Sequence, residues 1–198
     1  GELYLENSKS ESILLDDNRI KDSSYNSDLG FGFRAVSGET VAYSHSNEIS
    51  KNSLKVSANN LKSTLKSVQG IYNHSINKSN KRYYENINPI EQKTLNEKIA
   101  ILNKVNDYLR SKNDNVKQVT ANFSGEQKSI EIIRSGGETI TDIRPLVRLN
   151  VSITLEENGK KETGSVGFGG RYSYGDFFIE NNWKNEVKKA IDQASIML

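Results

Sequence analysis

The longest regular alternation in the chain runs from residue 147 to residue 155, and it constrains the fold more than any other feature. Five apolar residues, Val147, Leu149, Val151, Ile153 and Leu155, are separated by Arg148, Asn150, Ser152 and Thr154. Successive side chains of a β-strand point to opposite faces, so this pattern predicts a strand with one buried face and one face in water. A sheet with one solvated face is typical of antiparallel architectures.

Shorter runs of the same period predict further strands. They are marked by Leu3 with Leu5, Ile13 with Leu15, Phe31 with Phe33 and Ala35, Val41 with Tyr43, Val119 with Ala121 and Phe123, and Ile130 with Ile132. Asn, Asp and Gly tolerate left-handed backbone angles, so tight turns are predicted at 16–18, 37–39, 135–136 and 157–160. The strands therefore form hairpins.

Three segments have helical rather than strand spacing. Residues 48–68 carry an apolar stripe of Leu54, Ala58, Leu61, Leu65 and Val68, with Asn47 as the N-cap. Residues 88–112 begin with Asn88 as N-cap, Pro89 at the first helical position and Glu91, and their stripe is Leu95, Ile99, Leu102 and Leu109. The last helix, 183–198, presents Trp183, Val187, Ile191 and Ala194.

These elements predict an α+β domain in which a twisted antiparallel sheet packs against three main helices. We expect a first β-α half at 1–68, a mobile connection at 69–87, a helix at 88–112 and a second β-α half at 116–198. The two halves share an order of strands, hairpin and helix, which is consistent with an internal duplication of a strand-hairpin-helix unit.

Composition excludes several kinds of site and partner. The sequence has no cysteine, which excludes disulfides, thiolate nucleophiles and iron–sulfur clusters and fits a cytoplasmic protein. The sequence contains no run of about 18 apolar residues, so it predicts no membrane-spanning helix. The 27 basic and 25 acidic residues are interspersed, so the chain lacks the cationic stripe of a nucleic-acid-binding protein. Starting at Gly1 without a signal peptide and ending in an uncapped apolar helix, the chain is expected to be a fragment of a longer protein.

Few residues are suited to catalysis or metal binding. His45 and His74 are the only histidines, so no paired histidine zinc motif can form, and His45 is expected to be an ordinary strand residue. The basic and aromatic cluster of Lys78, Lys81, Arg82, Tyr83 and Tyr84 could stack on single-stranded nucleic acid, although a solvated loop explains it more simply. In the stretch 167–171 we expect close approach of another backbone rather than phosphate binding.

Arg144 and Arg148 are the strongest candidates for a binding role. Four residues apart on a strand, they leave the same face about 13 Å apart, which matches four residues of an extended peptide. Guanidinium groups placed in this way bind carboxylates. Pro145 between them cannot donate to a neighbouring strand and indicates an edge position. The alternative is an ion pair within the domain, for example with Glu156 or Glu157.

Five segments of the chain resemble motifs of one protein family. They read GFGFRAVSGE at 30–39, VTANFSG at 119–125, RPLVRLNVS at 144–152, EENGK at 156–160 and GFGGR at 167–171. They are similar, in the same order, to G-x-G-x-R-A-I-S-G-E, V-x-A-S-L-S-G, R-P-L-V-R-L-x-V-S, E-E-x-G-K and G-G-G-G-R of the TldD branch of the TldD/PmbA family. Phe168 replaces one glycine of the last motif, so a role that requires bare backbone is not expected there.

The resemblance implies the N-terminal domain of a cytoplasmic zinc metallopeptidase from a family also associated with modulation of DNA gyrase. The zinc ligands and catalytic Glu of that family lie in an H-E-x-x-x-H helix and at a later Cys, none of which this chain contains. The domain would be inactive alone. Its role would be to form the cleft of a two-subunit assembly, homodimeric or heterodimeric, and to admit short or unfolded peptides to the C-terminal domain.

Arg144, Arg148, Gly169 and Arg171 are therefore our candidate substrate-binding residues. We expect no cofactor in this chain and zinc in the full-length protein. The alternative function is a non-enzymatic protein-interaction module, consistent with the association with gyrase.

Overall fold

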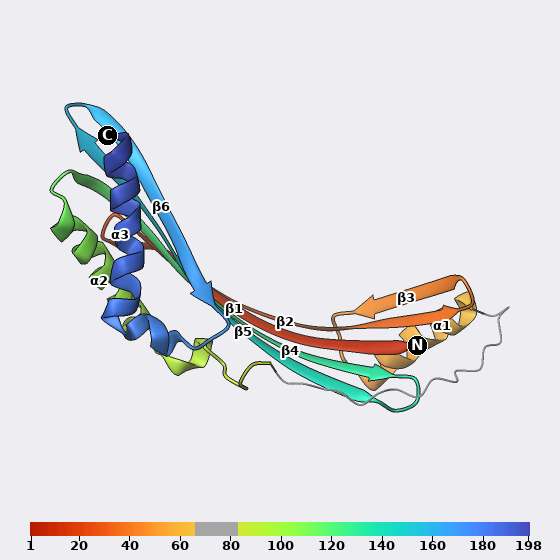
Figure 1. Ribbon diagram of the computed structural model, residues 1–198. Coiled ribbons are helices and arrows are strands. Elements are labelled where there is room, and N and C mark those ends of the chain that lie inside the picture. Colours follow the sequence, from red (N-terminus) through yellow and green to blue (C-terminus); the bar gives the residue numbers. More distant parts are fainter. Residues whose placement is uncertain (66–82) are drawn as a thin grey trace. The chain divides into compact units, whose positions relative to one another are not determined.

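The computed structural model describes residues 1–65 and 83–198, except for the side chains at 176 and 178 (Figure 1). The first series of elements is β1 (Glu2–Asp16), β2 (Arg19–Ser37), β3 (Thr40–Ser46) and α1 (Lys51–Thr64). Two helices follow, η1 (Ile90–Gln92), which is a 3-10 turn, and α2 (Leu95–Lys112). The second series is β4 (Val116–Arg134), β5 (Thr139–Glu157), β6 (Lys160–Gly170), η2 (Tyr174–Phe178) and α3 (Glu180–Met197).

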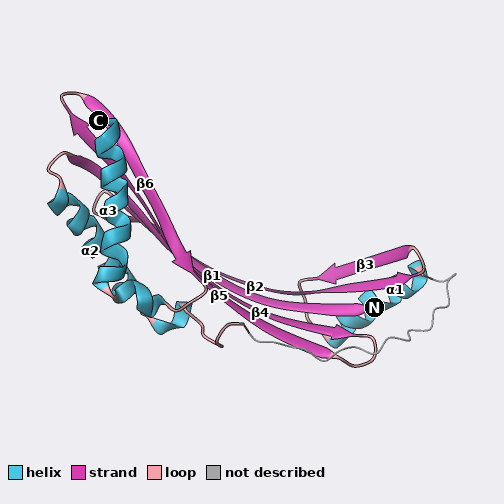
Figure 2. Ribbon diagram, in the orientation of Figure 1, coloured by secondary structure: helices cyan, strands magenta, loops and turns pink. Residues whose placement is uncertain are grey.

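The strands form a six-stranded sheet in the order β3-β2-β1-β4-β5-β6 (Figure 2). Its outer pairs, β2 with β3 and β5 with β6, are antiparallel, and three α-helices accompany the sheet. The predicted α+β fold with three main helices is confirmed. Three strands followed by a helix occur twice along the chain, which is the layout expected of a duplicated unit; the duplication itself stays a prediction.

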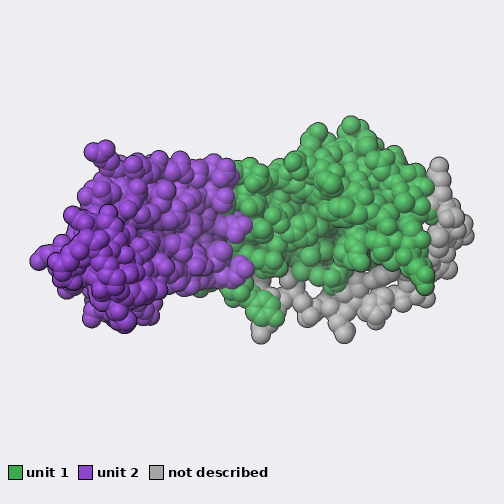
Figure 3. All heavy atoms as spheres, turned by 90° about the horizontal axis from the view of Figure 1, so that it is seen from above, with its two compact units in different colours: residues 1–9, 27–85, 128–144 green, residues 10–26, 86–127, 145–198 purple. Residues whose placement is uncertain are grey.

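The chain divides into two compact units that are not consecutive stretches (Figure 3). Unit 1 comprises 1–9, 27–85 and 128–144, and unit 2 comprises 10–26, 86–127 and 145–198. The strands β1, β2, β4 and β5 contribute residues to both units, because each is 15 to 19 residues long. Leu3 with Leu5 and Ile13 with Leu15, which are separate runs in the sequence, therefore belong to one strand, β1, and the polar stretch 19–30 is part of β2.

The predicted tight turns lie where expected. Asp17 and Asn18 join β1 to β2 with φ of 49° and 66°, and Asn158 and Gly159 join β5 to β6 with φ of 51° and 81°. Two central residues with positive φ match the right-handed twist of the flanking strands, so these turns hold the hairpins in register.

The alternation at 147–155 has the predicted orientation. All five apolar residues of the run are at most 2% exposed, and they belong to a cluster built from β1, β4, β5, η2, α2 and α3. The cluster also contains Phe123, Trp183 and Leu109. It lies entirely within unit 2, which therefore has a closed apolar core.

Two helices begin later than the sequence signals indicated. Helix α1 starts at Lys51 with Ser50 as its N-cap, not Asn47, and Ala58 is exposed. Asn88 and Pro89 introduce only the short turn η1, where Asn88 accepts a hydrogen bond from the Ile90 amide at 3.1 Å. Helix α2 instead begins after Thr94, which forms a capping box with Glu97.

The buried face of α2 also differs from the predicted stripe. Leu102 and Leu109 are buried, whereas Leu95 is 48% exposed and Lys98 is 2% exposed. The true stripe is shifted because the helix starts at Leu95 and packs through Ile101 and Val105. Helix α3 buries Trp183, Val187, Ile191 and Ala194, as predicted.

Lys98 is buried, and its charge is compensated inside unit 2. Its ammonium group lies 2.6 Å from Glu11 Oε1 and donates to the Ile90 carbonyl at 2.6 Å. The Tyr174 hydroxyl donates to the same Glu11 oxygen at 2.7 Å. Burial is the main cause that raises the pKa of Tyr174, and this hydrogen bond raises it further. Gly125 makes room for that hydroxyl, since a Cβ there would collide with it. This network of β1, η1, α2, β4 and η2 residues fixes the start of α2 in unit 2.

Unit 1 is built more simply. Helix α1 packs against β3, and among the described residues of the unit the buried apolar ones are Phe31, Ala42, Leu61 and Ile130. Most of the segment 69–87, predicted to be a mobile connection, lies outside the described residues, as does His74.

Candidate functional site

A shallow hollow lies on the solvated sheet face of unit 2. It has a volume of about 320 Å³, and it is lined by Thr120, Asn122, Arg148, Asn150, Val151, Ser152, Ser165, Val166 and Gly167. Strand alternation places Arg148, Asn150 and Ser152 on this face because their neighbours Leu149 and Val151 are in the core. The lining therefore combines apolar surface, including two valines, with neutral hydrogen-bonding side chains and one guanidinium.

The guanidinium of Arg148 is held in place by its neighbours. Its Nε donates to Asn150 Oδ1 at 2.7 Å, and Asn150 is paired with Gly167 across the β5–β6 ladder. A Cβ at Gly167 would lie 2.7 Å from an Arg148 nitrogen and 2.5 Å from Asn150 Oδ1. Gly167 is thus the residue that allows Arg148 and Asn150 to lie over β6.

Arg148 and Arg144 differ in their pairing. Arg144 donates to Asp142 at 2.6 Å, and this bond raises the pKa of Arg144. Among the described residues Arg148 has no carboxylate within 4 Å, and Glu156 pairs with Lys161 instead. Arg148 can therefore accept a carboxylate from another molecule without breaking an existing ion pair. Because Arg144 belongs to unit 1 and Arg148 to unit 2, the predicted 13 Å spacing remains untested.

Pro145 is buried and precedes the first β5–β6 pair, Val147 with Gly170. At Pro145 itself, β5 has no partner on the β6 side within the described part of the chain. The proline therefore interrupts no hydrogen bond to β6, as the edge interpretation predicted.

The remaining candidates, Gly169 and Arg171, lie at the end of β6. Gly169 faces β5 so closely that a Cβ would collide with the Val147 carbonyl, which confirms the expected close approach of a second backbone. Arg171 is exposed in the bend after β6 and does not line the hollow around Arg148. Their predicted substrate contacts remain predictions.

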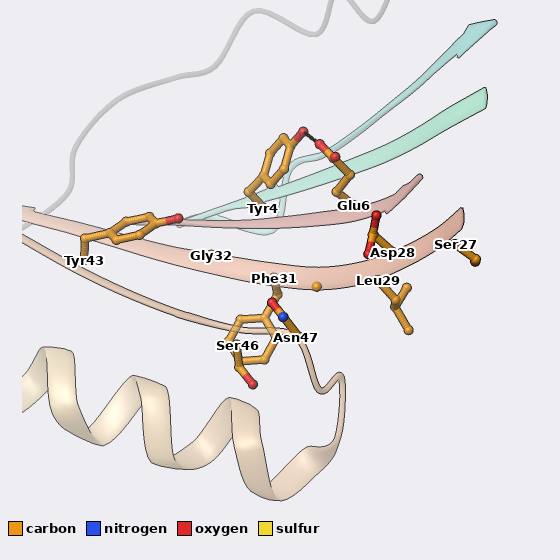
Figure 4. Close-up of a pocket in the computed structure, with 11 residues that line it drawn as sticks. Tyr4, Glu6, Ser27, Asp28, Leu29, Phe31, Gly32, Tyr43, Ser46 and Asn47 are labelled. Atoms are coloured by element: carbon orange, nitrogen blue, oxygen red, sulfur yellow. Dashed lines mark hydrogen bonds between the residues drawn. The ribbon is translucent and has the colours of Figure 1, made fainter. Parts of the chain in front are cut away.

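A larger hollow in unit 1 was missed by the sequence analysis. It has a volume of about 660 Å³ and is lined by Tyr4, Glu6, Ser27, Asp28, Leu29, Gly30, Phe31, Gly32, Tyr43, Ser46 and Asn47 (Figure 4). A Cβ at Gly32 would lie 2.6 Å from the Tyr43 hydroxyl, so Gly32 makes room for that side chain. The signal was present in the sequence: Gly30 and Gly32, two residues apart, leave one face of a strand bare.

Two tyrosines give this hollow its polar character. The Tyr4 hydroxyl donates to Glu6, and burial together with this bond raises the pKa of Tyr4 to about 12. Tyr43 is 66% exposed and stacks on His45 with ring centroids 5.8 Å apart. His45 is thus an exposed strand residue in contact with an aromatic ring.

Metal donors are not gathered anywhere in the described residues. No three or more His, Cys, Asp and Glu side chains there are grouped to hold a metal ion. A zinc ion of the kind expected for the full-length protein therefore does not fit the described part of this chain. None of the helices within residues 1–65 and 83–198 combines the length and the apolar character that crossing a bilayer requires.

Comparison with protein-family profiles identifies both halves of the chain. Residues 88–198 match the PmbA/TldA metallopeptidase central domain, and residues 1–68 match PmbA/TldA metallopeptidase domain 1. The chain belongs to the PmbA/TldD metallopeptidase family. The resemblance that the sequence motifs indicated is therefore confirmed.

Relatives named metalloprotease TldD homolog occur in several bacteria. The chain is 37% identical to the protein of Buchnera aphidicola subsp. Schizaphis graminum and 38% identical to that of Haemophilus influenzae, over 205 aligned positions each. All of this chain is covered in both alignments, but only 42% of each relative. The chain thus spans less than half the length of these TldD relatives.

Three solved structures share the fold. A protein from Thermotoga maritima, described as a candidate modulator of DNA gyrase, matches 96% of this chain and 43% of its own with a TM-score of 0.77 and 12% identity. A protein of the same description from Bacteroides thetaiotaomicron matches 98% of this chain and 44% of its own, with a TM-score of 0.72 and 13% identity. TldE from Thermococcus kodakarensis matches 98% of this chain and 43% of its own, with a TM-score of 0.70 and 13% identity.

Proposed function

We propose that this chain is the non-catalytic, substrate-admitting part of a TldD-like zinc peptidase that acts on short or unfolded peptides. Family membership supports the peptidase assignment, and the described residues offer no metal site of their own. The catalytic zinc and its ligands would belong to the C-terminal domain of the full-length protein. A related subunit would complete the cleft, and the structural neighbour TldE is an example of such a related protein.

The observation that carries the proposal is Arg148 without a carboxylate partner. A guanidinium anchored at Nε by Asn150 keeps its terminal nitrogens available, and the neutral lining offers hydrogen bonds but no competing acid. A peptide carboxylate covering this face would form charge-assisted bonds worth on the order of 1.5 to 3 kcal/mol. Arg144, Gly169 and Arg171 would contact the same class of ligand as secondary positions.

The test is peptide kinetics of the full-length, metal-loaded enzyme. Arg148→Ala should raise the Michaelis constant for acidic peptides on the order of tenfold, with fold and zinc content unchanged. Lys161→Ala removes an exposed cation of the neighbouring strand β6 and should leave the kinetics as they are. A lower melting temperature with unchanged kinetics would show that Arg148 serves only the structure.

The alternative is a non-enzymatic protein-interaction module. Two structural neighbours are described as candidate modulators of DNA gyrase, and these descriptions are the observation that favours the alternative. Absence of metal-dependent peptide cleavage by the full-length protein would select this alternative over the peptidase.

A further inference from the structure

Strand β2 has an open edge in unit 1. Its pairing with β3 begins at Phe31 with Ser46 and ends at Ser37 with Thr40, whereas β2 itself starts at Arg19. After Ser46 the chain leaves the sheet towards α1. In the part of the chain that the structure describes, no strand pairs with residues 27–30 on the β3 side. We call these four residues the open edge.

Unpaired strand edges bind extended polypeptide, because their amide and carbonyl groups are already spaced for a β ladder. Natural edges are commonly protected by charged side chains, above all lysine, by proline or by a bulge. The open edge reads Ser27-Asp28-Leu29-Gly30, and its one such residue is Asp28, a carboxylate that repels acidic strands but not basic ones. Ser27, Asp28 and Leu29 are exposed, so in the described part of the chain their backbone is accessible to a further strand.

Two hollows flank this edge, one on each face of the sheet. The 660 Å³ hollow includes Tyr4, Glu6 and Asp28, whose side chains lie on the face away from α1 in Figure 4. A second hollow of about 370 Å³ is lined by Leu5, Glu6, Asn7, Leu29, Ile49, Ser129, Ile130, Glu131, Thr141, Asp142 and Ile143. Leu29 lines both hollows and is 49% exposed.

We propose that the open edge binds an extended polypeptide segment as an added β-strand whose basic side chains alternate with apolar ones. Successive side chains of the added strand point to opposite faces. One set therefore enters the polar hollow beside Asp28, and the other lies over the apolar hollow at Leu29 and Ile49.

The charges around the open edge favour a basic residue in the added strand. Glu6 already accepts from Tyr4 and lies 3.3 Å from Lys128. Asp28 has no hydrogen-bond or ion-pair partner among the described residues, and it lies near Glu6 in Figure 4. A lysine or arginine of the added strand would pair with Asp28 without displacing an internal cation.

The same carboxylate argues against a second copy of this chain as the occupant. Antiparallel pairing of two open edges about a two-fold axis would bring the two Asp28 side chains to opposite or diagonal positions. Like charges placed in this way destabilise a strand pair. A separate polypeptide with basic residues meets no such repulsion.

This site is independent of the Arg148 proposal, since it lies in unit 1 and takes residues of opposite charge. Its test uses the full chain and three capped, fluorescently labelled peptides. In the first, lysines alternate with valines; in the second, glutamates replace the lysines; the third is the lysine peptide with N-methyl groups on alternate amides. Fluorescence anisotropy measures each dissociation constant.

The lysine peptide should bind at least about tenfold more tightly than the other two, because they lose the charge match or the ladder hydrogen bonds. Asp28→Asn should weaken the lysine peptide about two- to fivefold, the range expected for an exposed ion pair. Asp22→Asn, an exposed acid on the same strand, is the matched control and should change nothing.

Three results would overturn the proposal. Equal binding of the N-methylated peptide would exclude strand addition. Equal effects of Asp28→Asn and Asp22→Asn would exclude the charge selection. A dimer in analytical ultracentrifugation that Asp28→Asn strengthens, with no peptide bound, would make a second copy the occupant. None of these results bears on Arg148, whose kinetics are measured separately.

Discussion

The two compact units differ in how completely their helices cover the sheet. In unit 2, helices α2 and α3 contribute to a core in which Phe123, Leu149 and Trp183 are at most 1% exposed. In unit 1 a single α-helix packs on β3, and Val41 and Tyr43, which are 55% and 66% exposed, lie on the sheet face opposite to buried Ala42. On the face that carries buried Phe31, Leu29 is still 49% exposed. One helix cannot cover the whole inner face of a multistranded sheet.

The difference separates a scaffold from a surface available for binding. Exposed apolar groups next to an open strand edge are features of interaction sites, whereas a closed core mainly determines stability. Substitutions in unit 2 are therefore expected to cost more free energy of unfolding than matched substitutions in unit 1. The following predictions test this comparison, in order of decreasing effect.

The largest effect is expected at the core strand of unit 2. Val151→Asp would bury an unpaired carboxylate at a position 2% exposed, and the cost of several kcal/mol would remove much of a domain's usual stability of about 5 to 15 kcal/mol. Ser152→Asp, on the solvated face, should cost far less. Thermal denaturation of both variants measures the difference, and equal losses would contradict the assignment of faces.

A matched pair of leucines compares the two units directly. Leu109 of α2 is fully buried in unit 2, and Leu61 of α1 is 7% exposed in unit 1. Leu109→Ala should lower the free energy of unfolding by about 3 to 5 kcal/mol, and Leu61→Ala by about 2 kcal/mol, because fewer atoms surround the second cavity. Denaturant titration decides this. A larger loss for Leu61→Ala would reverse the comparison.

The smallest expected effects are at the helix N-termini. Thr94→Ala removes the capping box of α2 and should cost about 1 kcal/mol, more than Ser50→Ala, whose side chain forms a single capping bond. Urea denaturation of both variants at neutral pH would show the order. Equal costs would mean that the second bond of the box contributes little.

The same capping box predicts that the stability of the folded protein depends on pH in the acid range. Hydrogen bonds from the Thr94 amide and hydroxyl, together with Lys93, lower the pKa of Glu97 to about 2. A carboxyl whose pKa is lower in the folded state contributes stability above its unfolded value of about 4.5, and this contribution is lost as the pH falls towards about 2. Melting temperatures should therefore fall less steeply with acid in Glu97→Gln than in the unchanged protein.

Local signals in the sequence were sufficient for some elements and not for others. The turns at Asp17-Asn18 and Asn158-Gly159 and the faces of 147–155 were predictable, because each depends on two residues or on a period of two. The start of α2 was not. Asn88 and Pro89 are strong helix-start signals, but they are used for η1, whereas Thr94 and Glu97 form the cap of α2.

The candidate sites divide in the same way. Arg148 was found from its position on the polar face of a regular strand. Only the structure shows that it lacks a carboxylate partner, because Asp142 pairs with Arg144 and Glu156 pairs with Lys161. The hollow around Tyr4 and Tyr43 was missed although Gly30 and Gly32 marked one strand of it, because β1, β2 and β3 come together there only in the folded chain.

The sequence alone determined the family, the α+β class, the hairpin turns and the alternation of the central strand. These features depend on backbone preferences and side-chain periods that act over a few neighbouring residues. Only the tertiary structure decided where α2 begins, why Lys98 is buried and where β2 is left unpaired. Each depends on groups distant in sequence: Glu11 pairs with Lys98 and accepts a hydrogen bond from Tyr174 inside unit 2, and the end of β3 exposes the edge at Asp28. Such contacts have no local period, because they arise only when separate segments pack against one another.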